Sequence, residues 1–441
     1  MGHLPEVPVR VGKVAGVAAP EGLLPRLEQV PARSPDAAGR RAGGQDGVLV
    51  TVAHEPSLVV RIANLSRFVG GKPGHLGQDF GPAGLGVLIV FKDENRRAFA
   101  LHHAVAIGAE RAAGVLGHDA SAALIIDGKI VAAAEEERFI RDKHAKNLFP
   151  VEAAKYCLNE GGLNPEDVDI VTFPYAKIPF FSKARWHYAK RYWYAPDRAL
   201  DAIFNGNRRF RRNLNKAKDL MTSLNINKAE LIPVEHHLSH ASSAYHLSGF
   251  KEKTAIVGID GKGEYATTFF GYGENGKIHK IKEFYDPESL GGLYGAITEF
   301  LGFDMLDGEF KVMGMAPYGD PSLYDFSNLV SFRNGQLKVN TDLVNVIGLR
   351  RYKENGKGYY FSPKFVDMYG KKRSGDEIDL PYIHYAASIQ NKLEEIALQM
   401  IDYYLGDIIR ETGKICMAGG VALNVKLNQK IIDLPYVKEL F

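Results

Sequence analysis

Apolar, β-prone segments joined by glycine-containing turns recur along the chain from residue 114 onward. Residues 122–126 and 129–134 flank Asp127-Gly128, a dipeptide typical of a two-residue hairpin turn. A second unit repeats this arrangement, with strands predicted at 254–260, 265–272 and 277–284 and a turn at 274–276. In each unit a strand with an acidic end precedes turns and further strands, so we predict two related lobes of an α/β protein.

Helical patterns separate and follow these units. Residues 150–160 have a proline at the start and Gly161-Gly162 at the end, which predicts a helix with ordinary start and stop signals. The remaining predicted elements are strands at 168–173, 229–234 and 414–418, helical spacing over 183–224, a helix from near His236, and an amphipathic helix at 384–405.

The first 112 residues differ in composition from the rest. They contain three lysines and no Tyr, Trp or Cys, whereas the remainder is rich in Lys, Tyr, Phe, Ile and Asn. Such a shift indicates a boundary. We therefore expect residues 1–112 to be a low-order segment foreign to the domain, residues 113–253 to form a first lobe, and residues 254–441 a second, truncated lobe.

Bulk properties exclude some classes of protein. The chain of 441 residues is 45% hydrophobic and 24% charged, and no run approaches the ~20 apolar residues of a membrane-spanning helix. No signal peptide is evident, and Cys157 and Cys416 lack metal-type spacing, so we expect reduced core cysteines in a cytoplasmic protein without a membrane partner. A formal net charge of +3 does not by itself indicate nucleic-acid binding.

The strongest local signal is the segment EHHLSH. If a helix starts here, His236 and His240 lie one turn apart on one face, so both imidazoles can reach one metal ion. Asp260, at the end of the next apolar strand, could add an oxygen ligand, and this set suits iron or zinc. The alternative is that one histidine caps the helix and another is satisfied in the core; spacing alone leaves both open.

Two glycine segments could admit a phosphate close to the backbone. Gly261 and Gly263 follow the strand that ends at Asp260, and Gly419-Gly420 lies between a predicted strand and a helix start. An ordinary hairpin turn and a close-packing turn explain the same residues. Neither segment is a Walker A loop or a dinucleotide fingerprint, so both interpretations stay open.

Three further segments carry candidate chemistry. His118 and Asp119 precede the first hairpin in a run of small residues, where the imidazole could act as an acid or base. Arg138 and Lys143 could hold an anion, although charge runs of this kind are usually solvated. The segment at 309–319 has two glycines and a proline within an apolar stretch and is typical of a shaped loop.

Residues 183–218 are basic with interleaved Trp and Tyr, which makes contact with a phosphate backbone conceivable. An amphipathic helical insert with a solvated basic face accounts for the same pattern. We favour the insert, and nucleic acid is not expected as a partner.

In their order along the chain, HDASAAL, EEERF with a downstream KH, EHHLSHASSAY, IDGKGEYATT, KVMGMAPYG and AGGVALN resemble the NodU/CmcH-type carbamoyltransferase family. The resemblance covers about residues 114–441. The family is similar to threonylcarbamoyl-tRNA transferase proteins, which implies a two-lobed actin/sugar-kinase/Hsp70-like ATPase fold. The alternatives in function are a tRNA-modifying or RNA-binding relative and an inactive fragment.

This resemblance implies a reaction in which carbamoyl phosphate and ATP give carbamoyl adenylate, and the carbamoyl group passes to a hydroxyl of a small acceptor such as a nodulation factor or antibiotic. It also implies site residues. His236, His240 and Asp260 would hold Fe²⁺ or Zn²⁺, with Mg²⁺ as a candidate second ion, and His118 and Lys143 would face the reacting group. Residues expected along the nucleotide and its phosphates are Asp119, Arg138, Gly261, Gly263, Gly419, Gly420 and Asn424.

Three departures from the family pattern shape these expectations. Only Gly114-Val115-Leu116-Gly117 stands where the family opens with a strand, the chain stops before an acidic GD-type motif that would supply a fourth metal ligand, and the YrdC-like domain that makes the adenylate is absent. We therefore expect metal and nucleotide binding rather than the complete reaction, with a homodimer as the candidate assembly.

Overall fold

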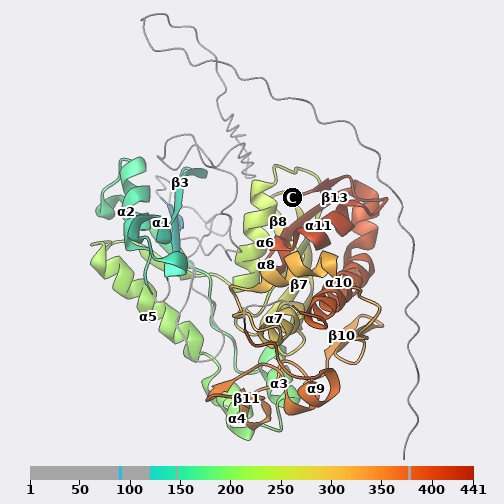
Figure 1. The fold of residues 1–441 in the computed structure, drawn as a ribbon. Helices are drawn as coiled ribbons and strands as arrows, with labels where there is room; N and C mark the ends of the chain where they lie inside the picture. The colour runs from blue at the N-terminus through green and yellow to red at the C-terminus, as the bar shows by residue number, and fades with distance from the viewer. Residues whose placement is uncertain (1–88, 92–119, 146–147, 376–378) are drawn as a thin grey trace, which may run out of the picture. The chain divides into compact units, whose positions relative to one another are not determined.

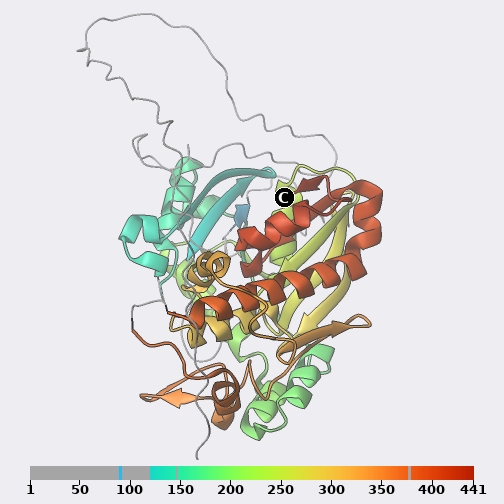
Figure 2. The same cartoon turned by 45° about the vertical axis from the view of Figure 1, so that its right-hand side comes forward.

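The computed structural model describes residues 89–91, 120–145, 148–375 and 379–441. For residues 89–91 it describes the backbone alone. The expected segment 1–112 and the site residues His118 and Asp119 therefore lie outside the described residues, except for strand β1 (Ile89–Phe91). The described residues form a mixed α/β structure with two five-stranded sheets (Figures 1 and 2).

The first sheet has the order β3-β2-β1-β4-β5. The predicted hairpin is confirmed as β2 (Ser121–Ile126) and β3 (Lys129–Glu135), with Asp127 and Gly128 both at positive φ, as a tight turn requires. The other strands are β4 (Ile170–Phe173) and β5 (Glu230–Pro233), which pair in parallel. The predicted strands at 168–173 and 229–234 are thus confirmed.

One face of this sheet is covered by helices. Helix α2 (Val151–Glu160) and helix α5 (Arg208–Ser223) share a core with Ala122 and Leu124 of β2, against which Ile126 also packs. Shorter elements complete this part of the chain: α1 (Glu137–Ile140), η2 (Lys143–Ala145), η3 (Pro165–Asp167), α3 (Lys183–Arg191) and α4 (Pro196–Asn205).

The second sheet has the order β14-β13-β6-β7-β8. Its predicted strands are confirmed as β6 (Thr254–Ile259), β7 (Ala266–Glu274), β8 (Lys277–Tyr285) and β13 (Lys414–Ala418), and β14 (Glu439–Leu440) joins one edge. Strand β6 is buried along its whole length because helices pack on both of its faces.

Alternate residues of β6 face different helices. Ala255, Val257 and Ile259 share a core with α10 (Tyr382–Thr412), whereas Ile256 packs with α6 (His236–Leu247). Figure 2 shows α10 crossing the face of this sheet. The helix predicted at 384–405 is confirmed and is longer at both ends. At its C-terminus it continues to Thr412 and is ended by Gly413, which has a positive φ.

The other elements lie around this core. They are α7 (Leu290–Phe300), α8 (Glu309–Met315), η4 (Ala316–Tyr318), β9 (Val330–Arg333), β10 (Gln336–Val339), η5 (Gly348–Arg350), β11 (Lys353–Glu354), β12 (Lys357–Gly358), α9 (Pro363–Tyr369), η6 (Gly420–Leu423) and α11 (Val425–Ile432). None of the helices in the described part of the chain combines the length and hydrophobicity that crossing a membrane requires.

The two sheets share one strand order. Numbered within each sheet by chain order, both read 3-2-1-4-5, but the first strand runs in opposite senses. Strand β6 is antiparallel to its hairpin and parallel to β13, whereas β1 is parallel to β2 and antiparallel to β4. The two predicted units therefore match in topology everywhere except at β1.

Candidate metal centre

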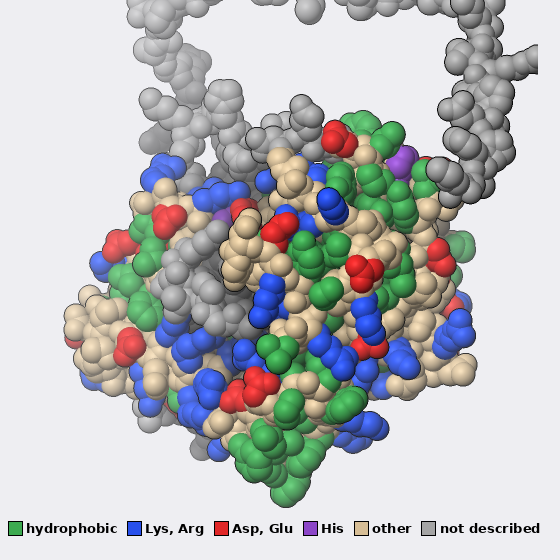
Figure 3. All heavy atoms as spheres, turned by 60° about the horizontal axis from the view of Figure 1, so that its bottom comes forward, with side chains coloured by type: hydrophobic (Ala, Val, Ile, Leu, Met, Phe, Trp, Pro, Cys, Tyr) green, Lys and Arg blue, Asp and Glu red, His purple; other side chains and the backbone are tan. Residues whose placement is uncertain are grey.

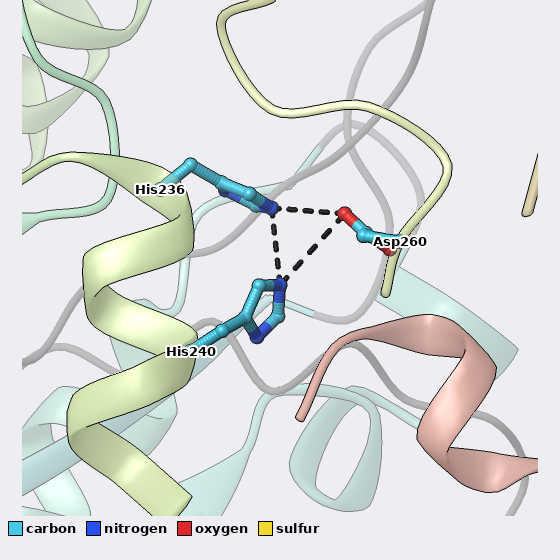
Figure 4. Close-up of side chains that lie close together, drawn as sticks. All are labelled: His236, His240 and Asp260. Atoms are coloured by element: carbon cyan, nitrogen blue, oxygen red, sulfur yellow. Dashed lines mark hydrogen bonds and ion pairs between the residues drawn. The ribbon is translucent and has the colours of Figure 1, made fainter. Parts of the chain in front are cut away.

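Three side chains predicted as metal ligands converge at the start of α6. His236 Nε2 lies 3.1 Å from Asp260 Oδ2 and 3.1 Å from His240 Nε2, and His240 Nε2 lies 3.8 Å from Asp260 Oδ2 (Figure 4). The helix that begins at His236 places the two imidazoles one turn apart, and Asp260 follows β6 directly. All three ligand atoms lie within 4.8 Å of one another, close enough to share one ion.

The protonation states of these groups suit a metal ion, which binds deprotonated ligands. Burial, with the neighbouring His240, lowers the pKa of the His236 imidazole. Burial alone would raise the pKa of the Asp260 carboxyl, but hydrogen bonds with His236 and His240 hold it well below its usual value. Two imidazole nitrogens and a carboxylate form an N/O donor set that fits divalent iron or zinc.

His237, the middle histidine of the motif, is not among these ligand atoms. Its side chain is fully buried, with its ring centroid 5.5 Å from that of His236 and 6.1 Å from that of His240, and burial lowers its pKa to about 3. His237 is therefore a core histidine, but it is not the satisfied one of the alternative interpretation, because neither ring nitrogen has a hydrogen-bond partner among the described residues.

Glu264 holds the first turn of α6 in place. Its Oε1 accepts hydrogen bonds from the backbone N–H of His236 at 3.2 Å and of Ala176 at 2.6 Å. These bonds satisfy one of the N–H groups that a helix start leaves unpaired, in a place where the N-cap residue Glu235 makes no side-chain cap. Burial raises the pKa of Glu264 to about 7.

The residue before Glu264 also packs on the metal cluster. A Cβ on Gly263 would lie 2.9 Å from Cβ and Cδ2 of His236, so only glycine fits beside the imidazole. The structure thus gives Gly263 a packing role, and its predicted contact with a nucleotide stays a prediction. Gly261 lies on the other side of the loop and lines a pocket.

This pocket adjoins the metal cluster and has a volume of about 120 Å³. Asp260 belongs to both, because it also lines the pocket. The walls come from the loop after β6 and from α7, α8, α10 and η6. The lining residues are Asp260, Gly261, Gly291, Tyr294, Leu306, Glu309, Phe310, Met313, Leu393, Gly420, Val421, Leu423 and Asn424.

The Gly-Gly segment after β13 forms one edge of the pocket. Gly419 has φ of 85°, and a Cβ there would lie 2.5 Å from the carbonyl oxygen of Ile259, so the backbone can approach β6 only as glycine. Gly420 donates its N–H to Asp260 Oδ1 at 3.1 Å. Asn424 caps α11 through Leu427 N–H at 3.0 Å.

The opposite wall was not identified from the sequence. Glu309 accepts hydrogen bonds from the backbone N–H groups of Leu306 at 2.9 Å and Gly308 at 3.2 Å, and burial raises its pKa. Tyr294 donates to Gln390, which also accepts from Asn424. The segment 309–319, expected to be a shaped loop, forms the helices α8 and η4 instead.

Lys143 reaches the rim of the pocket from the first sheet. Its Nζ lies 3.3 Å from Asp307 Oδ1, which also lies 3.0 Å from His144 Nε2, and Asp307 follows the lining residue Leu306. Arg138, predicted to hold an anion, pairs instead with Glu135 at 3.1 Å and Glu137 at 3.3 Å. Within the described residues, the structure therefore brings Lys143, but not Arg138, towards the pocket.

Comparisons with known proteins identify the family. The chain is 34% identical over 328 residues to an uncharacterised protein of Synechocystis, covering 71% of the chain and 51% of that relative. It is 31% identical over 331 residues to nodulation protein NolNO of Sinorhizobium fredii, covering 74% of the chain and 43% of that relative. An uncharacterised protein of Methanocaldococcus jannaschii is 27% identical over 319 residues, with 72% and 51% covered.

The chain thus spans about half the length of these curated relatives. The sequence model of the family described as carbamoyltransferase N-terminus matches residues 111–441, which include every described element except β1. The match contains the converging His236, His240 and Asp260 as well as the pocket beside them. The chain belongs to the carbamoyltransferase family.

Proposed function

We propose that the chain is the metal- and nucleotide-binding part of an O-carbamoyltransferase that uses carbamoyl adenylate, made from ATP and carbamoyl phosphate. One observation carries the proposal: Asp260 is shared between a cluster of metal-type ligands and a pocket large enough for part of a small molecule. Such an arrangement brings a bound ion next to a bound substrate. The acceptor is a hydroxyl of a small molecule.

A two-lobed ATPase fold is part of this proposal. Its support is the strand order 3-2-1-4-5, which both five-stranded sheets share. In α/β folds ligands bind where strands end and loops converge. Here the loops that follow β6 and β13, two adjacent parallel strands, supply Gly261 and Gly420 to one pocket.

The glycine segments and the metal-binding side chains would contact different parts of the bound substrate. Gly261, Gly420 and Asn424 would lie along the nucleotide, where the two glycines have no side chain that would keep a phosphate from the backbone. His236, His240 and Asp260 would hold the ion, which when bound supplies positive charge against phosphate oxygens. Mg²⁺ accompanying the ATP is a further expectation of the same proposal.

The chemical step is a transfer to oxygen. The acceptor oxygen forms a bond to the carbamoyl carbon, the bond from that carbon to the phosphate oxygen breaks, AMP leaves, and the hydroxyl proton passes to a base. His118 is proposed as that base. Lys143, whose Nζ lies 3.3 Å from Asp307 Oδ1, would neutralise the departing phosphate.

Calorimetric titration of the iron- or zinc-loaded chain with AMP tests the site. A Cβ at position 420 would lie 3.1 Å from Asp260 Oδ1, so Gly420→Val should abolish AMP binding. Gly314→Val is the matched control, because a Cβ on Gly314 meets nothing within 4 Å. Equal AMP affinity in both variants would contradict the assigned nucleotide position.

Transfer itself is tested by mass spectrometry. A version of the protein that spans the full length of its curated relatives is incubated with ATP, carbamoyl phosphate and hydroxyl-bearing acceptors, and products heavier by one carbamoyl group are sought. A product that forms in the absence of ATP would contradict the adenylate route.

A further inference from the structure

A cluster of exposed aromatic side chains lies on the helical segment between β4 and β5. We name Phe180, Phe181, Trp186 and Phe204 the aromatic cluster. Their exposed fractions are 41%, 83%, 44% and 68%, and the ring of Phe180 lies 5.0 Å from Phe181, 6.2 Å from Trp186 and 6.4 Å from Phe204 between centroids. Leu200, 54% exposed, stands one turn before Phe204 on α4. Contiguous exposed apolar side chains of this size mark an interaction surface.

The cluster is held in a fixed arrangement by a buried arginine. Arg185 donates from Nη1 to the carbonyl of Ile203 at 3.0 Å and from Nη2 to that of Ile178 at 2.9 Å. These bonds join α3, the end of α4 and the segment that carries Phe180. The aromatic surface is therefore preformed.

The segment that carries the aromatic cluster is rich in positive charge. Between residues 177 and 218 the sequence has twelve Lys and Arg and two acidic residues. On α3, Lys183, Trp186 and Lys190 are exposed at the spacing of one helix face. Figure 3, in which the end of the molecule with α3 and α4 comes forward, shows hydrophobic side chains gathered among Lys and Arg.

Much of this charge is available to a partner. Among the described residues, no ion pair forms at Lys183, Lys190, Arg211 or Arg212, whereas Arg208 pairs with Asp201 at 2.9 Å. The exposed basic residues of the segment are Lys177, Lys183, Lys190, Arg198, Arg208, Arg211, Arg212 and Lys218.

The chemistry of the surface selects among occupants. A second copy of the same surface would bring positive charge against positive charge. Single-stranded nucleic acid stacks its bases on ring faces, but the exposed Leu200, one turn from Phe204 on α4, offers apolar surface without a stacking face. An anionic lipid surface offers an apolar layer for the aromatic rings and negative headgroups for Lys and Arg at the same depth.

We propose that the aromatic cluster and its surrounding Lys and Arg side chains dock this protein on an anionic lipid bilayer. The docking is attachment to the surface and not insertion of a spanning helix. The expectation of no membrane partner followed from the lack of a long apolar run, which bears on spanning alone.

Hydrogen bonds connect this surface to the loop that follows Asp260. Arg209 Nη1 donates to the carbonyl of Gly263 at 2.7 Å, and the Tyr265 hydroxyl donates to the carbonyl of Ala202 in α4 at 3.4 Å. Lys262 of the same loop forms a partly buried ion pair with Asp286 beside the ring of Tyr188 in α3. Docking would consequently hold the metal cluster at a fixed place relative to the bilayer surface.

The two tryptophans of the chain make the test direct, because Trp186 and Trp193 both lie in this segment and are 44% and 73% exposed. The full chain is titrated with vesicles of phosphatidylcholine alone and of phosphatidylcholine mixed with phosphatidylglycerol. We expect a blue shift of tryptophan emission, quenching by brominated acyl chains, and co-sedimentation with the anionic vesicles only. Absence of all three signals would overturn the proposal.

Variants separate the apolar and the electrostatic contributions. Phe181→Ser with Phe204→Ser should weaken vesicle binding by at least about tenfold, because two large rings no longer enter the lipid. Leu323→Ser with Met368→Ser is the matched control, since these side chains are 57% and 54% exposed elsewhere. Lys183→Glu with Lys190→Glu should weaken binding by about fivefold or more for each charge lost.

The other occupants give distinct results. Filter binding to RNA that persists in the vesicle-binding buffer and is lost with the Phe181/Phe204 variant would overturn the lipid assignment in favour of nucleic acid. A dimer in analytical ultracentrifugation that the same variant dissociates would assign the surface to a second copy. Unchanged melting temperatures establish that each variant is folded.

Discussion

The Nε2 atoms of His236 and His240 lie 3.1 Å apart, with Asp260 Oδ2 completing a triangle of potential ligands. Ring nitrogens that face each other at this distance gain more from a shared cation than from one weak hydrogen bond between them. The pair therefore points to an ion and not to two independent structural histidines.

Removal of one imidazole should empty the site. We expect His240→Ala to lower affinity for iron or zinc by more than about 100-fold, since it deletes a ligand and not merely its support. Metal content after purification, measured by inductively coupled plasma mass spectrometry, checks this. His279→Ala is the control, because His279 is exposed on β8 away from the cluster. Full metal content in His240→Ala would show that the ion, if bound, lies elsewhere.

Loss of the Glu264 carboxylate should weaken the metal site without touching a ligand. Glu264 positions His236 through its backbone N–H at 3.2 Å, so we expect Glu264→Ala to reduce metal affinity by about 10- to 100-fold. Glu264→Gln keeps an acceptor oxygen and should restore most of the affinity. Competition with a chromophoric chelator measures both. Equal affinities for the Ala variant and for the control Glu411→Ala, exposed on α10, would exclude a positioning role.

The two cysteines should be inert in the folded protein. Burial raises the pKa of the thiols of Cys157 and Cys416 to about 12 in each case. At pH 8 the reactive thiolate is then about a thousandfold scarcer than for a thiol of ordinary pKa. Iodoacetamide should label both only after denaturation. Rapid labelling of the native chain at pH 8 would contradict the buried positions.

Glu283 should make stability depend on pH. Burial, with the neighbouring carboxyl of Glu235, raises the pKa of Glu283 from 4.5 to about 7. The folded chain therefore keeps this proton at pH values where the unfolded chain has lost it, so the contribution of Glu283 to stability is full below pH 4.5 and falls as pH rises towards 7.

Glu283→Gln cannot ionise and should lose this dependence. Urea denaturation at several pH values measures the free energy of unfolding of both proteins. We expect Gln to gain relative to Glu as the pH rises from 4.5 to about 7. A constant difference across this window would show that Glu283 titrates normally in the folded state.

Local patterns were sufficient for most of the fold. The Asp127-Gly128 turn fixed the β2–β3 hairpin, and the proline and glycines around residues 150–162 bounded α2 to within a residue. The i, i+4 spacing of His236 and His240 likewise placed two metal ligands on one helix face. In each case the signal lies within a few residues of the structure that it determines.

Other features depend on contacts between distant residues. Glu264 supports a helix start 28 positions earlier, and its motif resembled a phosphate loop because glycines next to a strand serve both purposes. Glu309 and Tyr294 line the same pocket as Asn424 because α7, α8 and α10 pack together, with Gln390 of α10 hydrogen-bonded to both Tyr294 and Asn424. No local periodicity specifies such tertiary contacts, so the sequence identified one wall of the pocket and not the other.

The carboxylate of Asp260 has two different neighbours: Oδ2 faces the imidazoles, and Oδ1 accepts the N–H of Gly420. Rotation of this carboxylate towards an ion must alter the hydrogen bond that it accepts from the N–H of Gly420. Occupancy on either side should consequently change affinity on the other by the same factor, a reciprocity that equilibrium thermodynamics imposes. Under the proposed function, iron and nucleotide would therefore each change the affinity of the chain for the other, even with every residue of the pocket intact.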